Sequence, residues 1–94
     1  MTLVHRSPHG TVTIPESVLL AIAVRAAESV DGVHVRRKRS VDVEANAVRL
    51  EVEAPRATPL PQVGAAVQDA VAAALESMCG LAAVRVDVAV EELA

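Results

Sequence analysis

The sequence Glu28-Ser29-Val30-Asp31-Gly32-Val33 recurs forty-eight residues later as Glu76-Ser77-Met78-Cys79-Gly80-Leu81. Each copy follows a segment with apolar residues at helical spacing and precedes a segment in which apolar and polar residues alternate. Glycine is the usual residue just beyond a helix, because without a Cβ it adopts the left-handed backbone conformation easily. The repeat therefore predicts two helix-to-strand units, with Gly32 and Gly80 capping the two helices.

Two segments place apolar residues on one helical face each. The first stripe consists of Val18, Leu19, Ile22, Ala23, Ala26 and Val30, and the second of Leu60, Val63, Val67, Val71, Ala74, Leu75 and Met78. On the second helix, Gln62, Asp69 and Glu76 lie opposite the stripe and are expected to be exposed. We expect Val63, Val67, Val71, Leu75 and Met78 to be buried against a sheet.

Strands are predicted at residues 11–14, 41–44, 48–54 and 84–90, where β-branched or alternating apolar residues occur. The two middle strands are joined at Ala45-Asn46 and form an expected hairpin. The order is β-α-β-β-α-β, which predicts an α/β chain of the α+β two-layer sandwich type. It has one mixed sheet of about four strands, both helices on one face and the charged residues on the other.

The chain of 94 residues is long enough for one domain. Residues 1–9 are polar and are expected to form a flexible N-terminal arm, and residues 10–94 form the domain. The single cysteine, Cys79, excludes an internal disulfide and is typical of a reducing compartment, so we expect a cytoplasmic protein. The net charge of −3 and the absence of aromatic residues give no sign of specific nucleic-acid binding. No apolar stretch is long enough for a membrane span.

No catalytic, metal-binding or cofactor-binding residue set stands out in the sequence. The carboxylates Asp42, Glu44, Glu51 and Glu53 alternate with apolar residues, as on the solvated face of a hairpin. The potential metal ligands His5, His9, His34 and Cys79 are scattered, whereas structural zinc sites take ligands in close pairs. Cys79 also lies at a helix C-terminus, where the helix dipole disfavours a thiolate. We therefore expect no catalytic residue, no metal site and no cofactor.

Surplus apolar residues on the first predicted helix suggest self-association. Leu20, Ala21 and Val24 lie off the buried stripe and would remain wet in a monomer. We expect Leu20 and Val24 to belong to a homo-oligomer interface. The basic run Arg36, Arg37, Lys38 and Arg39 would lie at or beyond the rim of that interface. The same run is also compatible with an anionic surface as partner, or with a solvated strand end.

Several short motifs occur in an order that is shared with a known family. They are Gly10-Thr11-Val12-Thr13-Ile14, Asp31-Gly32-Val33, Val67-Gln68, the repeat at 76–81 and the valine-rich end at 84–88. In this order and spacing the chain resembles the alkaline shock protein family of bacterial envelope stress response proteins. The sequence departs from the family pattern at Cys79, where Thr is usual. It also departs at residues 36–39, where the basic run replaces a longer glycine-containing segment.

The resemblance implies a non-enzymatic cytoplasmic protein that self-associates. In some members of the family a separate anchor protein holds it peripheral to the cell membrane. It supplies no catalytic residues. An alternative interpretation is a small regulatory ligand-binding module, because ferredoxin-like sensor domains share the β-α-β-β-α-β order. That alternative requires a cleft with convergent polar groups, whereas the first interpretation requires oligomers.

Overall fold

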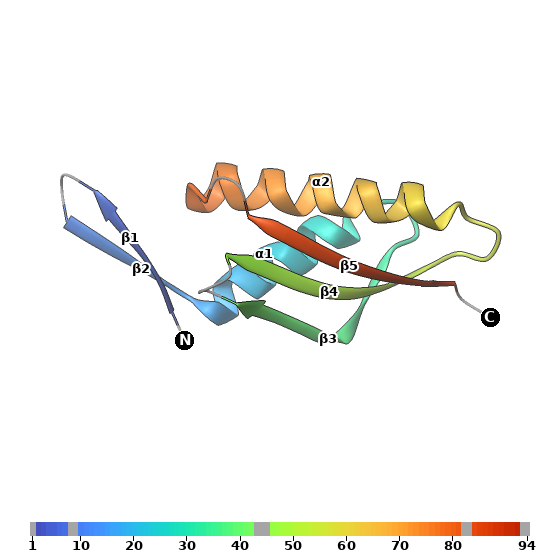
Figure 1. Cartoon of the computed structure of the whole chain (residues 1–94), viewed down its shortest axis with the longest axis horizontal. Coiled ribbons are helices and arrows are strands. Elements are labelled where there is room, and N and C mark those ends of the chain that lie inside the picture. The colour runs from blue at the N-terminus through green and yellow to red at the C-terminus, as the bar shows by residue number, and fades with distance from the viewer. Residues whose placement is uncertain (1, 8–9, 43–45, 82–83, 93–94) are drawn as a thin grey trace.

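The computed structural model of the chain describes residues 2–7, 10–42, 46–81 and 84–92. Its elements, in chain order, are β1 (Thr2–Ser7), β2 (Gly10–Pro15), α1 (Glu16–Glu28), β3 (His34–Asp42), β4 (Ala47–Ala54), α2 (Leu60–Cys79) and β5 (Arg85–Glu92) (Figure 1). The predicted strand residues Val43 and Glu44 lie outside the described residues, as does Ala45 of the expected turn. Asn46 has a φ of 51°, the left-handed conformation that asparagine tolerates in turns.

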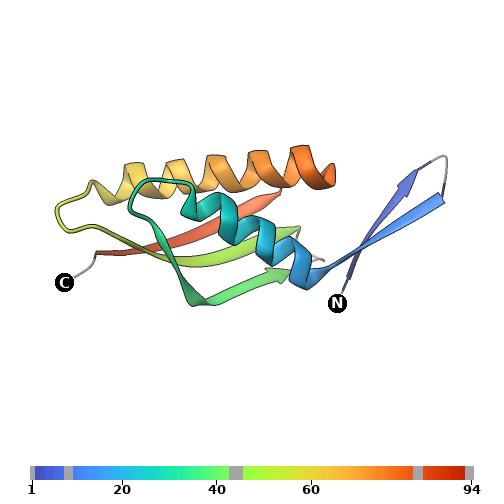
Figure 2. The ribbon, with the colours of Figure 1, turned by 180° about the vertical axis from the view of Figure 1, so that it is seen from behind.

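The body of the fold is a two-layer α+β sandwich, as predicted from the sequence. Strand β4 lies between β3, its antiparallel neighbour, and β5, its parallel neighbour. Both helices cover the same face of this mixed sheet (Figures 1 and 2). Within the described part of the chain, neither helix is long and apolar enough to cross a membrane.

The sheet has three strands rather than the expected four, because β2 pairs with β1 in a separate antiparallel hairpin. Within the expected N-terminal arm, Thr2–Ser7 forms strand β1. The reason lies at Pro15, which has extended backbone angles and is followed directly by α1. No loop residue remains there to turn β2 back onto the sheet. The hairpin consequently projects from one end of the body (Figure 2), and the molecule measures 49 × 20 × 19 Å.

The core lies between the helices and the inner face of the sheet. Its fully or nearly buried residues are Leu19, Ala23, Ala27, Val33, Val35, Val48, Leu50, Val52, Ala54, Val63, Val67, Val71, Leu75 and Val86. The burial predicted for α2 is confirmed at Val63, Val67, Val71 and Leu75, and Gln62, Asp69 and Glu76 are exposed. It is wrong at Met78, whose exposed fraction is 68%.

The buried stripe predicted for α1 is confirmed only in part. Leu19 and Ala23 are buried as expected, and Ala27, which was not in the predicted stripe, is buried with them. Ile22, Ala26 and Val30 are half-buried against the core. Ala23 and Ala27 are completely buried, since their small side chains let the helix approach its neighbours closely. Val18 is 44% exposed as a result.

The two glycines of the repeat both have a left-handed backbone, but only one caps a helix. Gly80 is the C-cap of α2, with a φ of 70°, and its N–H donates to Glu76 O at 2.9 Å. The expectation that Gly32 caps α1 is wrong, because α1 ends at Glu28 and its C-cap is Ser29. Gly32, with a φ of 75°, lies in the turn that follows. A left-handed turn and a left-handed cap both favour glycine, so the sequence pattern does not distinguish them.

Candidate functional site

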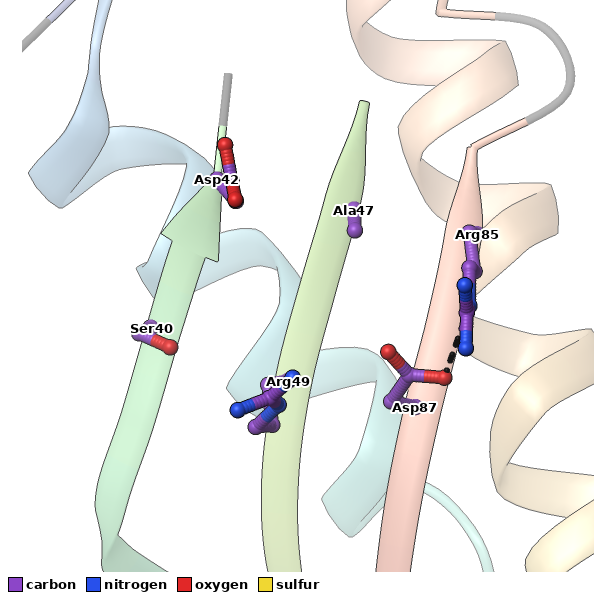
Figure 3. A pocket seen from close by; sticks show the side chains of 6 residues that line it. All are labelled: Ser40, Asp42, Ala47, Arg49, Arg85 and Asp87. Carbon is purple, nitrogen blue, oxygen red and sulfur yellow. Dashed lines mark hydrogen bonds and ion pairs between the residues drawn. The ribbon is translucent and has the colours of Figure 1, made fainter. Parts of the chain in front are cut away.

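The outer face of the sheet, which the helices leave uncovered, carries a shallow polar pocket of about 190 Å³. Its lining residues come from all three strands: Ser40 and Asp42 from β3, Ala47 and Arg49 from β4, and Arg85 and Asp87 from β5 (Figure 3). The small side chains of Ser40 and Ala47 leave the hollow between the longer charged ones. Alternation along the strands therefore produced the solvated charged face that the sequence predicted.

The charges of this pocket balance one another. The Arg85 guanidinium donates from Nε to Asp87 Oδ1 at 3.0 Å, and the β4–β5 register places Arg49 opposite Asp87. The lining thus contains two arginines and two aspartates. Exposed ion pairs of this kind contribute about 0–1 kcal/mol each. This arrangement is typical of a solvated sheet surface on which charges of both signs alternate with small residues.

Of the basic run, the structure describes the side chains of Arg36 and Arg39, and these two have different surroundings. Arg36 lies on the outer face, where its Nε is 3.4 Å from Glu53 Oε1 and its Nη1 also pairs with Glu91. Arg39 lies farther along β3, opposite Leu50, and donates to the Arg36 carbonyl at 3.3 Å. The side chains of Arg37 and Lys38 lie outside the described part of the structure. The β3–β4 register is irregular between Val35 and Arg39, so the run coincides with a bulge.

The structure brings one member of the basic run next to the two apolar residues that were expected at an interface. Leu20 and Val24 line an open groove on α1 together with Ala21, Arg25, Glu28, Ser17 and Arg39. Both are half-buried, and Val24 packs against the core. They therefore offer less free apolar surface than the sequence suggested.

A second groove, which the sequence did not predict, lies between α1 and α2. It has a volume of about 480 Å³ and is lined by Ser17, Val18, Ala21, Ile22, Arg25, Ala26, Ala74 and Met78. Val18 and Met78 are the large apolar side chains left exposed among the described residues. Helical periodicity assigned both residues to the core, because it shows which face of a helix is apolar. It does not show whether a neighbouring helix covers that face along its whole length.

His34 has a local structural partner, and Cys79 is a partly buried free thiol. His34 Nδ1 is 3.1 Å from Glu28 Oε2, and the same carboxylate oxygen accepts the Val35 backbone N–H at 3.1 Å. Burial raises the pKa of the Cys79 thiol, which disfavours the nucleophilic thiolate. Within residues 2–7, 10–42, 46–81 and 84–92, no three His, Cys, Asp or Glu side chains gather in a way that could hold a metal ion.

The two edges of the sheet differ in how open they are. At the β3 edge, the Val35 N–H donates a hydrogen bond to the Glu28 carboxylate, and the bulge interrupts the regular pairing of the strand. At the β5 edge, Gln68 donates to Val86 O, but Arg85–Glu92 pairs with β4 without any register shift and contains no proline. Bulges and side-chain blocks are devices that protect an edge from pairing with another chain, whereas a long regular strand invites it. The β5 edge is therefore the candidate interaction site.

No protein-family model matches the chain, and neither the curated proteins nor the solved structures contain a significant match.

Proposed function

We propose that this chain is a non-enzymatic protein that acts through self-association and protein–protein contacts in a bacterial envelope stress response. The ordered motifs that resemble the alkaline shock protein family support this assignment, and the two-layer fold is compatible with it. The observation that supports the self-association is the β5 edge, a regular strand without a bulge or a proline, on which Gln68 donates one hydrogen bond to Val86 O.

An edge strand presents a row of backbone N–H and C=O groups that can bond to a strand of another chain. Strand β5 is eight residues long, and the backbone groups of every second residue face its open edge. Its valines have high β propensity. A second copy of the chain is always present at equal concentration, and symmetric homodimers are the commonest soluble assemblies. The proposal therefore takes the second copy as the partner.

The cellular setting is part of the same proposal and comes from the resemblance. We place the protein in the cytoplasm, peripheral to the cell membrane, and held there by a separate membrane-anchored protein. The lone cysteine, with its raised pKa, is compatible with a reducing compartment.

Light scattering coupled to size exclusion tests the self-association over a range of concentrations. We expect a mass of twice the 9.8 kDa of one chain, or a larger multiple, at high concentration. A strictly monomeric protein would contradict the proposal. A monomer whose thermal midpoint rises saturably with a small anion, through Arg49 and Arg85 of the outer pocket, would favour the regulatory ligand-binding module instead.

A further inference from the structure

The backbone groups of β5 divide into two sets that face opposite sides. The Arg85 N–H donates to Asn46 O, just before β4, at 2.9 Å. The next residue turns the other way, because Val86 O accepts from Gln68 Nε2 at 3.0 Å, on the side away from β4. In a parallel pair this alternation continues along the strand. Val86, Val88 and Val90 therefore direct their backbone groups toward the open edge.

We propose that two copies of the chain join through β5, antiparallel, around a two-fold axis that places Val88 opposite Val88 of the second copy. The inference rests on the proposed self-association and names the surface that carries it. Residues whose backbone groups face the edge then meet one another, as an antiparallel ladder requires. The three-stranded sheets become one continuous sheet with all helices on the same face.

Ladder length and charge together select this register, because axes at Val86 or Val90 would pair fewer residues of β5. With Val88 on the axis, Arg85 lies opposite Glu91 of the second copy, and Asp87 lies opposite Ala89. Moving the axis to Asp87 would place two Asp87 carboxylates directly opposite each other. Moving it to Ala89 would place Asp87 opposite Glu91. Opposite charges across a strand pair stabilise it and like charges destabilise it, so the Val88 register is the favoured one.

Both partners of this contact already have an ion pair within a single copy, because Arg85 donates to Asp87 and Arg36 pairs with Glu91. Arg36 is the one guanidinium shared by the Glu53 and Glu91 carboxylates on the outer face. Arg85 of the second copy would supply another cation beside Glu91. Both side chains are accessible for it, since Arg85 is 75% exposed and Glu91 is 55% exposed.

The neighbourhood of the β5 edge also permits close approach. Val86 O already accepts from Gln68, but a carbonyl oxygen has two lone pairs and can accept the Val90 N–H of a second copy as well. On α2, Gly64 lies over Val90, where a Cβ would be 3.5 Å from Val90 Cγ2. Because glycine has no side chain, α2 places no bulky group directly above Val90. The β3 edge offers no comparable ladder, because Glu28 and the bulge occupy it.

Charge reversal with a mixing step tests the interface. Arg85→Glu or Glu91→Arg alone makes both ion pairs of the homodimer repulsive, and we expect the dimer Kd to rise about tenfold or more. An equimolar mixture of the two variants restores two attractive pairs, so we expect a heterodimer with a Kd near that of the wild type. Arg56→Glu, an exposed charge change in the β4–α2 loop, is the matched control and should leave the Kd unchanged.

Cysteine cross-linking tests the register independently. In a Cys79→Ser background, Val88→Cys places two thiols on residues whose Cα atoms are about 5.5 Å apart, within the span of a disulfide. Val90→Cys is the matched control, because the two introduced thiols would lie about 13 Å apart along the strands. We expect an oxidised dimer for Val88→Cys and none for Val90→Cys.

The outcomes separate the two levels of the proposal. Recovery of the dimer on mixing and cross-linking at position 88 support the β5 interface, and neither can arise from an unfolded variant. A wild type that is dimeric, together with variants that dimerise equally well and fail to cross-link, would overturn this interface while the proposed self-association stands. A monomeric wild type would overturn both.

Discussion

Replacing Gly32 by alanine tests the turn that joins α1 to β3. Gly32 has a φ of +75°, and a Cβ added to it would lie 2.6 Å from Pro55 Cγ and 3.0 Å from Pro55 Cδ. The left-handed conformation costs an alanine about 1–2 kcal/mol. Overlap with a rigid proline ring adds about 1–3 kcal/mol, because the loop must shift. We therefore expect Gly32→Ala to lower the free energy of unfolding by about 2–5 kcal/mol.

Pro55→Ala separates the two contributions, because it removes the ring atoms that a new Cβ would meet. In a double-mutant cycle, we expect Gly32→Ala to cost only about 1–2 kcal/mol in the Pro55→Ala background. Urea unfolding followed by far-ultraviolet circular dichroism provides the measurement, since the chain has no aromatic residue to report on packing. Equal costs in the two backgrounds would show that Pro55 does not contact this position. A cost below about 0.5 kcal/mol in the wild type would refute the strained turn altogether.

Four further variants or measurements follow from the burial pattern. Val71→Asp should unfold the domain, because it places an unpaired charge at a completely buried position; a folded variant by circular dichroism would show that this face is not the core. Met78→Glu should change the midpoint of urea unfolding little, since that side chain is mostly exposed, and a large loss would mean that the inter-helix groove is closed. The double variant Leu20→Glu with Val24→Glu should stay folded and, if β5 carries the assembly, keep its mass in light scattering; monomers would instead assign the interface to α1. Cys79 should react with iodoacetamide at pH 8 more slowly in the native than in the urea-unfolded chain, because its raised pKa lowers the thiolate fraction, and equal rates would contradict the burial.

Local periodicity predicted the elements of the body well, because it reports which side of each element is apolar. The stripe of Val63, Val67, Val71 and Leu75 specified α2 and its buried face. The same stripe failed at Met78, in the last turn of the helix, where the side chain faces an open groove. A sequence period gives the direction of a side chain but does not show what lies opposite it.

Pairings between distant segments were the part that the sequence did not predict. Thr2–Ser7 is polar and short, and it forms a strand through its pairing with β2. In the candidate site, too, the local pattern was predictable from the sequence and the long-range arrangement was not. Alternation predicted the charged outer face, but the sequence contains no local sign that β5 lies at an edge, because edge position depends on the order of strands in the sheet. It likewise gave no sign that Glu28 protects the opposite edge.

The bulge in β3 has a consequence for how the chain tolerates changes in length. Val35 pairs with Val52 before the bulge and Val41 pairs with Val48 after it, and both pairs keep their apolar side chains toward the helices. A regular strand transmits an insertion to every following residue, which then points to the wrong face. A bulge absorbs additional residues locally. Segment 36–39 is therefore the place in the sheet where residues can be added or removed while the core keeps its register. It is also the natural position for grafting a foreign loop.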